Sequence, residues 1–229
     1  MAKAARGKVE SGFPQSAATT VNNGRAFAPN LVLEAKSLAC ERGGRLIFKE
    51  LNFSVRGGEV VELRGPNGSG KSSLLRLLAG LNKPVAGSLE FISSTSVMPA
   101  TAIAENAHYI GHHETVKPAL TVKENLAFWS DFHGGVANLT TFKLQHLADD
   151  HARLLSEGQR RRLSLSRLVS VKRSIWLLDE PTVGLDQTAL ADLRDIIEAH
   201  LSCGGLAIAA THADLGLAKM RTIKLAAHN

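Results

Sequence analysis

One short stretch, GPNGSGKS from Gly65 to Ser72, constrains the fold of this chain more than any other. It follows EVVELR, a β-branched run that predicts a strand, and precedes SSLLRLLAGL, whose leucines recur at helical spacing. A glycine loop between a strand and a helix lets backbone amides converge on phosphate oxygens, and the helix directs its positive end at them. The spacing G-x-x-x-x-G-K-[ST] therefore predicts a nucleotide phosphate site in an α/β fold.

The loop and the first turn of the following helix supply the candidates for nucleotide binding. Lys71 is placed to reach the β- and γ-phosphates, and the Ser72 hydroxyl is placed to bind Mg²⁺. The alternative, a chance glycine turn, does not account for the strand before the loop and the helix after it. The nucleotide-binding candidates in this stretch are Gly65, Pro66, Asn67, Gly68, Ser69, Gly70, Lys71, Ser72 and Ser73.

A second stretch, IWLLDE, is a continuously apolar run that ends in two carboxylates, Asp179 and Glu180. Such a run is typical of a strand in a parallel sheet that is covered on both faces. We expect Asp179 to hold Mg²⁺ together with Ser72, through water. Glu180 is the candidate that orients or deprotonates the attacking water. The alternative is a pair of carboxylates at a solvated strand end.

The sequence LSEGQ distinguishes between classes of nucleotide hydrolase. A GTPase would need an Asn-Lys-x-Asp motif, and the only Asn-Lys pair of the chain is followed by proline. LSEGQ instead places a serine and a glycine at a helix start, which is a second anion-binding arrangement. One nucleotide does not need two such helix ends from the same chain, so we expect a head-to-tail pair of chains around each ATP. The residues expected to act across that pair are Leu155, Ser156, Glu157, Gly158 and Gln159.

Strands and helices alternate along the chain, which predicts a parallel sheet with right-handed crossovers. An antiparallel β portion is expected at about 31–58 and 85–95, and a short helical portion at about 113–155. A loop rich in Ser, Thr and Ala is expected after SLEFIS, and Thr121 is expected to cap a helix. Further strands are expected at LVLEAKSLAC, LNFSV, SLEFIS, HYIG and GLAIAATH, and helices at LTVKENLAFWSDF, Thr141–Asp150, LSEGQRRRLSLSRLVSV and ALADLRDIIEAHL.

The composition limits the remaining possibilities. The chain has 229 residues, a net charge of +6 and 21% charged residues, which fits one globular domain. Its basic stretches are most simply solvated helix faces. No apolar run reaches the roughly 20 residues needed to cross a bilayer. Residues 1–29 have little apolar periodicity and are expected to be a disordered extension, which leaves 30–229 as the ATP-binding domain. Cys40 and Cys203 are expected to be reduced thiols.

Five motifs in chain order resemble the ATP-binding subunits of ABC transporters: GPNGSGKS, LSEGQ, LLDEP, GLD at Gly184–Asp186, and ATH ending in His212. The resemblance runs from Leu31 to about Leu225. It implies a P-loop NTPase with a RecA-like parallel-sheet core, an antiparallel β subdomain and a short helical subdomain. It also implies ATP and Mg²⁺ as cofactors, a homodimer that closes on two ATP molecules, contact of His212 with the γ-phosphate, and Asp186 across the dimer interface.

Within that family, CERGGRLIF, YIGHHETVKPALTVKENLAFW and GQRRRLSLSRL resemble the ATPases of the cytochrome c biogenesis haem exporter, the CcmA family. The resemblance implies a peripheral ATPase on the cytoplasmic face of the inner (plasma) membrane, with a separate CcmB-like transmembrane subunit and a CcmC-like protein nearby. Haem export, or release of a haem chaperone, is the implied process, and no nucleic-acid partner is expected. Two alternatives stay open: the ATPase of another ABC exporter for lipid or drug, and a soluble ABC ATPase that acts on ribosomes or nucleic acid.

Several positions depart from the usual ABC pattern. His112 stands where a glutamine usually touches Mg²⁺ or the attacking water; an inert loop pair with His113, or a haem or transition-metal ligand, are the alternatives. Arg42 stands where an aromatic residue usually stacks on adenine, and its guanidinium plane can stack in the same way. Glu157 replaces a glycine that is usual in this LSEGQ motif, the signature of the family, and near a phosphate its charge is unfavourable unless it is directed outward. GLD replaces the more usual SALD, which alters the contacts expected between the two copies.

Overall fold

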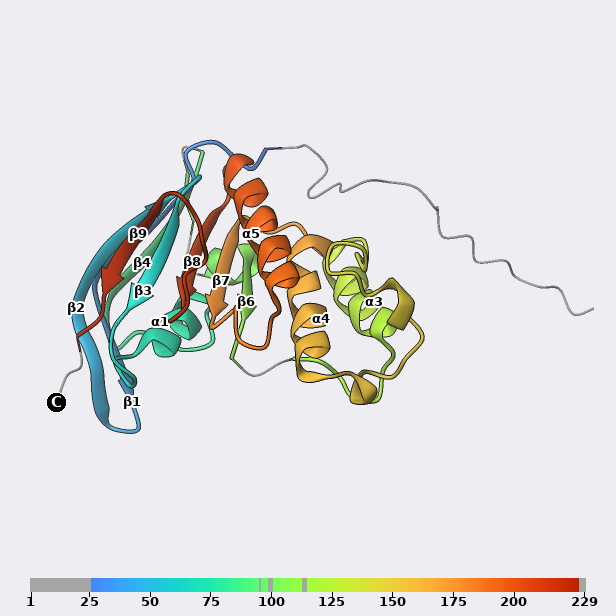
Figure 1. The fold of residues 1–229 in the computed structure, drawn as a ribbon. Coiled ribbons are helices and arrows are strands. Elements are labelled where there is room, and N and C mark those ends of the chain that lie inside the picture. The colour runs from blue at the N-terminus through green and yellow to red at the C-terminus, as the bar shows by residue number, and fades with distance from the viewer. Residues whose placement is uncertain (1–25, 95, 99–100, 113–114, 227–229) are drawn as a thin grey trace, which may run out of the picture.

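The computed structural model describes residues 26–94, 96–98, 101–112 and 115–226. Its elements are β1 (Val32–Arg42), β2 (Arg45–Arg56), β3 (Val60–Arg64), α1 (Lys71–Leu78), β4 (Ala86–Ser93), β5 (Ser96–Met98), α2 (Thr101–Asn106), β6 (Ala107–Ile110), α3 (Val122–His133), the 3₁₀ turns η1 (Gln145–Leu147) and η2 (Ala152–Leu154), α4 (Glu157–Ser170), β7 (Ile175–Asp179), α5 (Gln187–Ser202), β8 (Leu206–Ala210) and β9 (Met220–Lys224). Figure 1 shows the two sheets at one end of the molecule and α3 at the other, with α4 and α5 between them.

The larger sheet is parallel and has the strand order β6-β7-β8-β3-β9. Every residue of β7 and β8 is buried. Alternate side chains face opposite cores: Ile175 and Leu177 lie in the core that holds α1, whereas Trp176 and Leu178 lie in the core that holds α4 and α5. The prediction that these apolar runs are strands covered on both faces is confirmed.

The smaller sheet is antiparallel and has the strand order β2-β1-β4-β5. β1 pairs with β2 on one side and with β4 on the other. Apolar side chains of both long strands, among them Leu33 and Val55, are fully buried against the core that holds α1. The antiparallel portion agrees with the expectation for 31–58 and 85–95 and extends through β5 to Met98.

The parallel sheet determines where the predicted motifs meet. β3 ends at Arg64, just before the glycine loop, and β7 ends at Asp179. Because β3, β7 and β8 run parallel as neighbours, their carboxyl ends lie at one edge of the sheet. Ligands bind at this edge in open α/β sheets, so the loop and both carboxylates come to the same place.

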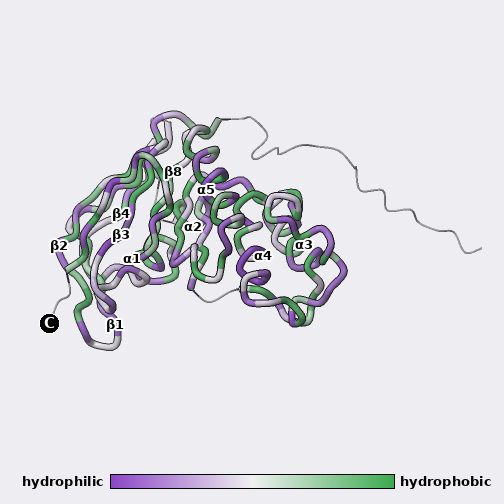
Figure 2. The backbone as a smooth tube through the Cα atoms, in the orientation of Figure 1, coloured by the Kyte–Doolittle hydropathy of each residue, from purple (hydrophilic) through white to green (hydrophobic). Residues whose placement is uncertain are grey.

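The helical portion agrees with the sequence at its start. α3 begins after Thr121, whose hydroxyl accepts a hydrogen bond from the Glu124 amide while the Glu124 carboxylate accepts one from the Thr121 amide. This reciprocal pair is a capping box, so the expected cap is confirmed. In Figure 2 the first turns of α4 are coloured as hydrophilic, which reflects its run of three arginines.

The helix expected at Thr141–Asp150 is wrong. Within that range only Gln145–Leu147 form a 3₁₀ turn. Lys143 has a φ of 56°, which lies outside the right-handed helical region. The side-chain oxygen of Asn138 accepts hydrogen bonds from the amides of Thr140 and Thr141, so a side chain organises this turn in place of helical backbone bonds.

Two further parts of the chain differ from the expectations. The segment after SLEFIS contains β5 and α2 as well as loop, and β9 closes the parallel sheet without having been predicted. Residues 1–25 lie outside the described part of the chain. Phe27, inside the expected extension of residues 1–29, contacts the folded body: its amide donates to the Cys203 carbonyl at 2.8 Å, and its ring lies edge-on to His200.

Candidate active site

The glycine loop leads into α1 with Lys71 lying back across it. The Lys71 Nζ donates to the Gly65 carbonyl at 2.7 Å and to the Pro66 carbonyl at 3.2 Å. Gly70, the N-cap of α1, has a φ of 95° and provides no side-chain cap. No cap side chain therefore occupies the first amides of α1, and those amides and the helix dipole suit a bound anion.

Close packing explains two of the glycines in the loop. A Cβ at Gly70 would lie 2.4 Å from Ile47 Cγ2, and a Cβ at Gly65 would lie 2.4 Å from the Leu225 carbonyl oxygen. Such distances are shorter than real carbon contacts, so a side chain at either position would force the neighbouring segment to move. β2 and the segment after β9 thus pack closely against the loop and restrict its conformation.

The two residues expected to hold Mg²⁺ lie together. The Ser72 hydroxyl donates to Asp179 Oδ1 at 3.1 Å, and the Tyr109 hydroxyl donates to Asp179 Oδ2 at 3.4 Å. Asp179 is buried, and burial followed by the charge of this carboxylate raises the pKa of Tyr109 above its usual value. A hydroxyl and a carboxylate are hard oxygen ligands of the kind that Mg²⁺ takes, so the residues present fit this ion.

Glu180 and His212 face each other at the ends of β7 and β8. His212 Nε2 lies 3.5 Å from Glu180 Oε1, and the His212 amide donates to Glu180 Oε2 at 3.4 Å. The Glu180 amide donates to the Ala210 carbonyl at 2.7 Å, which joins the two strand ends. The Glu180 side chain is 18% exposed and that of His212 is 61% exposed, so the pair opens toward the surface.

The start of α4 is closed by its own side chains. The Ser156 hydroxyl accepts from the Gln159 amide at 3.2 Å, and Gln159 Oε1 accepts from the Ser156 amide at 2.8 Å. Glu157 is exposed in the single chain. A Cβ at Gly158 would lie 2.7 Å from the Gly184 carbonyl oxygen, so the loop after β7 packs directly on this helix start.

Asp186 has a local role in its own chain. Its side chain caps α5 by accepting a hydrogen bond from the Ala189 amide at 2.8 Å. One of its carboxylate oxygens lies 3.9 Å from the guanidinium of Arg162 in α4. The contact of Asp186 with a second copy stays a prediction.

Arg42 and His112 occupy exposed positions near strand ends. Arg42 is the last residue of β1, and His112 follows β6 at the edge of the parallel sheet. Stacking of Arg42 on adenine and contact of His112 with water or Mg²⁺ stay predictions. His113 lies outside the described residues. Across residues 26–94, 96–98, 101–112 and 115–226, no group of three or more His, Cys, Asp or Glu side chains is arranged to hold a metal ion.

Two residues that are not among the predicted site residues contribute to the site. One is Tyr109, described above. The other is Arg161 of α4, which is 3% exposed and donates to the backbone carbonyls of Asp179 and Glu180. The prediction that the basic run around Arg161 is a solvated helix face is wrong for Arg161 itself, which is buried. Its spacing from Leu165 and from Leu168, four and seven residues later, is the signal that places it on the buried face of the helix.

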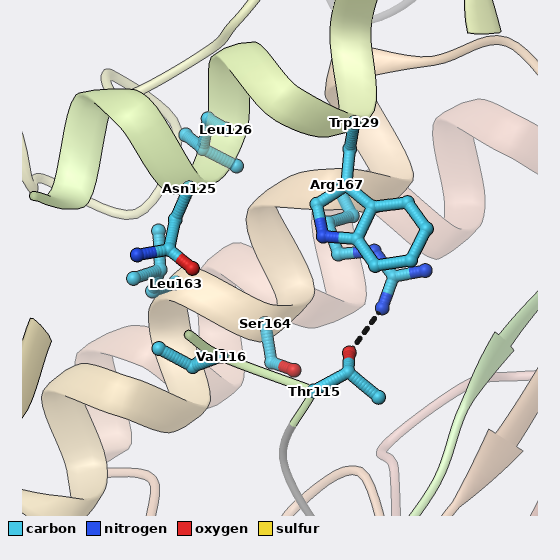
Figure 3. A pocket seen from close by; sticks show the side chains of 8 residues that line it. All are labelled: Thr115, Val116, Asn125, Leu126, Trp129, Leu163, Ser164 and Arg167. Carbon is cyan, nitrogen blue, oxygen red and sulfur yellow. Dashed lines mark hydrogen bonds between the residues drawn. The ribbon is translucent and has the colours of Figure 1, made fainter. Parts of the chain in front are cut away.

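A cavity lies between α3 and α4, beside the segment that follows His112 (Figure 3). Arg167 donates to the Thr115 hydroxyl, and its guanidinium lies 3.7 Å from the centroid of the Trp129 ring. Burial, and then the nearby charge of Arg173, lowers the pKa of Arg167 to about 10, so it stays charged at neutral pH. The cavity is lined by Thr115, Val116, Asn125, Leu126, Trp129, Leu163, Ser164 and Arg167.

Comparison with known proteins identifies the family. Residues 48–183 match the model of the ABC transporter family. The chain is 51% identical over 190 residues to a Rhodopseudomonas palustris (strain HaA2) protein named cytochrome c biogenesis ATP-binding export protein CcmA, covering 81% of this chain and 94% of that protein. It is 49% identical over 191 residues to the protein of the same name from Nitrobacter winogradskyi, with the same coverage of both chains.

A solved structure supports the fold. The dimeric structure of a post-hydrolysis state of an ATP-binding cassette bound to ADP and Pi superposes with a TM-score of 0.70 at 23% identity, covering 86% of this chain and 97% of that chain. Within the described residues, no helix is both long enough and apolar enough to span a bilayer. The chain belongs to the ABC transporter ATP-binding family and, within it, to the cytochrome c biogenesis ATP-binding export proteins, the CcmA family.

Proposed function

We propose that this chain hydrolyses ATP as the peripheral subunit of an ABC exporter that serves cytochrome c biogenesis. One observation carries the proposal: the Glu180 carboxylate lies 3.5 Å from His212, at the sheet edge where Ser72 and Asp179 are hydrogen-bonded. That arrangement supports a role for the Glu180 carboxylate as the base in ATP hydrolysis. The names of the relatives at about half identity support the biological process.

In the proposed complex the triphosphate lies over the start of α1. The loop amides and the positive end of α1 bind the phosphates, and Lys71 leaves the Gly65 and Pro66 carbonyls to contact the β- and γ-phosphates. Ser72 and Asp179 hold Mg²⁺, which neutralises charge on the phosphates when it is bound. Arg42 stacks on the adenine base.

Glu180 then takes the proton of the attacking water. A positioned general base typically contributes about 10²–10⁴ in rate. His212 holds the carboxylate through its backbone amide. Its imidazole, 3.5 Å from that carboxylate, contacts the γ-phosphate in the proposed complex. His112, at the neighbouring strand end, contacts the same water or Mg²⁺ and reports nucleotide state to the segment that follows it.

The site is completed by a second copy of the chain. Ser156 and Gly158 of one copy face the γ-phosphate bound by the other, with the Glu157 carboxylate directed away from it, and Asp186 lies in the interface between the copies. Such an interface is expected to bury about 1,200–2,000 Å². Closing and opening of this dimer drives a separate CcmB-like transmembrane subunit, with a CcmC-like protein nearby, at the cytoplasmic face of the inner membrane. Haem, or release of a haem chaperone, is the proposed cargo step.

Glu180→Gln tests the reaction and the dimer together. The variant keeps the shape of the side chain but cannot accept the proton, so turnover is expected to fall by about 10²–10⁴, whereas ATP affinity is retained. With ATP bound and hydrolysis blocked, the variant is expected to accumulate as a dimer, measured by light scattering and by crosslinking across Ser156. Normal turnover in Glu180→Gln, or a monomer at saturating ATP and Mg²⁺, contradicts the proposal.

A second experiment tests the process. The chain is reconstituted with its membrane subunit in vesicles, and ATPase activity is measured with haem, lipid or a lipophilic drug added. Stimulation by haem, or restored cytochrome c maturation in cells that lack the endogenous ATPase, is the expected result. Stimulation by lipid or drug alone assigns the chain to another exporter.

A further inference from the structure

One side chain links α4 to two strand ends of the active site. Arg161 is 3% exposed. Its Nη1 donates to the Gly111 carbonyl at 2.9 Å, and its Nη2 donates to the Asp179 carbonyl at 3.1 Å and to the Glu180 carbonyl at 2.6 Å. The planar fork of a guanidinium suits several carbonyls at once, whereas an ammonium is a single point of charge.

The carbonyls that Arg161 binds belong to the residues that carry the chemistry. Gly111 directly precedes His112. The other two carbonyls belong to Asp179 and Glu180, whose side chains are the two carboxylates of the site. Burying a guanidinium is unfavourable unless hydrogen bonds compensate for the lost water. The three carbonyls therefore fix the position of the Arg161 guanidinium, and the same hydrogen bonds hold the backbone of Gly111, Asp179 and Glu180 in place.

Glu180 needs such support because its backbone is strained. Its φ is 49°, a region that residues other than glycine rarely adopt. The conformation is held from both sides: the Glu180 amide donates to the Ala210 carbonyl at 2.7 Å, and the Glu180 carbonyl accepts from Arg161 at 2.6 Å. This conformation directs the carboxylate toward the His212 amide.

α4 also binds the chain on both sides of His112. Arg161 binds the carbonyl of Gly111 just before it, and Arg167 binds the hydroxyl of Thr115 after it. α4 thus holds both ends of this segment. The start of α4 is the part expected to act on the second copy, so one helix connects the phosphate contact in the other copy with the base in its own.

We infer that Arg161 is a positioning residue for hydrolysis: it holds Glu180 in its strained conformation and fixes the strand end before His112. The inference rests on the proposed ATPase function and adds a specific device to it. Arg161 binds no nucleotide in this account. Its loss displaces the base and leaves the phosphate loop intact.

Arg161→Gln tests the inference through the kinetic parameters. A small displacement of a catalytic group costs up to about 100-fold in rate, so kcat is expected to fall by about 10–100-fold. The affinity for ATP measured without Mg²⁺ is expected to stay unchanged because Lys71 and Ser72 are untouched, and the KM for MgATP is expected to change far less than kcat because Arg161 binds Asp179 only at its backbone carbonyl. Arg161→Lys keeps the buried charge but loses the fork, and is expected to recover part of kcat.

Arg173→Gln is the matched control. Arg173 also donates to a backbone carbonyl, that of Ala104 at 3.3 Å, and is partly buried, but its hydrogen-bond partners Ala104 and His133 lie outside the site. Its replacement is expected to lower the unfolding temperature and to leave kcat unchanged. If Arg161→Gln does not fold, Arg161→Lys decides: a normal kcat in a folded Lys variant overturns the inference.

ATP-dependent dimerisation distinguishes the positioning of Glu180 by Arg161 from a role of Arg161 in the dimer contact at the start of α4. In a Glu180→Gln background, adding Arg161→Gln is expected to leave the ATP-bound dimer intact, because dimer formation does not require the base. Loss of that dimer assigns Arg161 to the start of α4 and overturns the inference. Failure of the proposed function looks different: the unmodified chain then shows no turnover, and Glu180→Gln alone forms no dimer.

Discussion

The chain has two helix starts that are expected to meet phosphate, and they differ in how their own amides are used. α1 begins at a glycine N-cap that offers no side-chain acceptor. α4 begins at Ser156, whose hydroxyl is already bound to the Gln159 amide. A helix leaves its first amides without backbone partners, so all of these amides in α1 are left to an anion, whereas in α4 one of them, that of Gln159, is already bound by the Ser156 cap.

This difference gives the two regions different tasks. The α1 region holds the phosphate loop, Ser72 and Asp179 in one chain and is arranged to bind nucleotide without help. The α4 region is stabilised in part by its own capping box and is expected to meet phosphate only in the other copy. We therefore expect substitutions at α1 to change nucleotide affinity of the single chain, and substitutions at the start of α4 to change stability and dimerisation.

The largest expected effect is that of Lys71→Ala. Hydrogen bonds to charged groups contribute about 1.5–3 kcal/mol each, so ATP affinity of the isolated subunit is expected to fall by about 10–150-fold. Titration with a fluorescent ATP analogue measures this, and Lys83→Ala, an exposed lysine outside the site, is the control. An unchanged dissociation constant removes the distinction between α1 and α4.

The next effect is a loss of stability at acid pH, to which His108 of β6, beside the C-terminal end of α4, contributes. Burial, and then the charges of Arg167, Arg173 and His133, lowers the pKa of His108 from 6.5 to about 3, although the carbonyl of Val171 at the end of α4 accepts from its ring. Below pH 6.5 His108 becomes protonated in the unfolded chain, whereas in the folded chain it stays neutral until the pH approaches 3. Stability due to this group is therefore complete above the unfolded pKa and falls as the pH drops toward the folded value.

Between about pH 6.5 and pH 5, His108 accounts for up to about 2 kcal/mol of this loss. Urea unfolding at both pH values measures it, and His108→Gln is expected to reduce the slope, with the exposed His146→Gln as the control. Hydrogen exchange at pH 5 is expected to increase more in α4 than in α1, which packs through leucines that do not titrate. Equal increases in both helices contradict this part of the comparison.

The smallest expected effect is that of Ser156→Ala. Loss of the cap destabilises the protein by about 0.5–2 kcal/mol, measured by urea unfolding, and weakens the ATP-dependent dimer of the Glu180→Gln variant. ATP affinity of the single chain is expected to stay unchanged. If Ser156→Ala weakens that affinity as much as Lys71→Ala does, the start of α4 binds nucleotide within its own chain and the comparison fails.

Prediction from sequence succeeded where local rules and long-range structure agree. The strand before the glycine loop, the apolar runs of β7 and β8, and the cap at Thr121 are each confirmed, because period, composition and capping point to one answer. The meeting of Ser72 with Asp179 also followed, since parallel strands end at one edge of the sheet.

Prediction failed where tertiary contacts decide. The apolar residues of Thr141–Asp150 resemble a helical pattern, yet Phe142 and Leu144 are both fully buried and the turn at Lys143 separates them. β9 has mostly exposed side chains, so no apolar run marks it, and only pairing with β3 makes it a strand. The role of Arg161 depends on carbonyls distant in sequence, which no local pattern reveals.

The close packing of Gly158 against the Gly184 carbonyl bears on whether a glycine at this position indicates ATPase activity in a homologue. At 2.7 Å from that oxygen, no side chain fits at position 158, whatever the helix start binds. A relative that had lost the ability to use ATP would still be under pressure to keep a glycine here, simply to fold. That glycine alone therefore gives little information about whether a given homologue is an active enzyme; the carboxylate at position 180 is the better diagnostic.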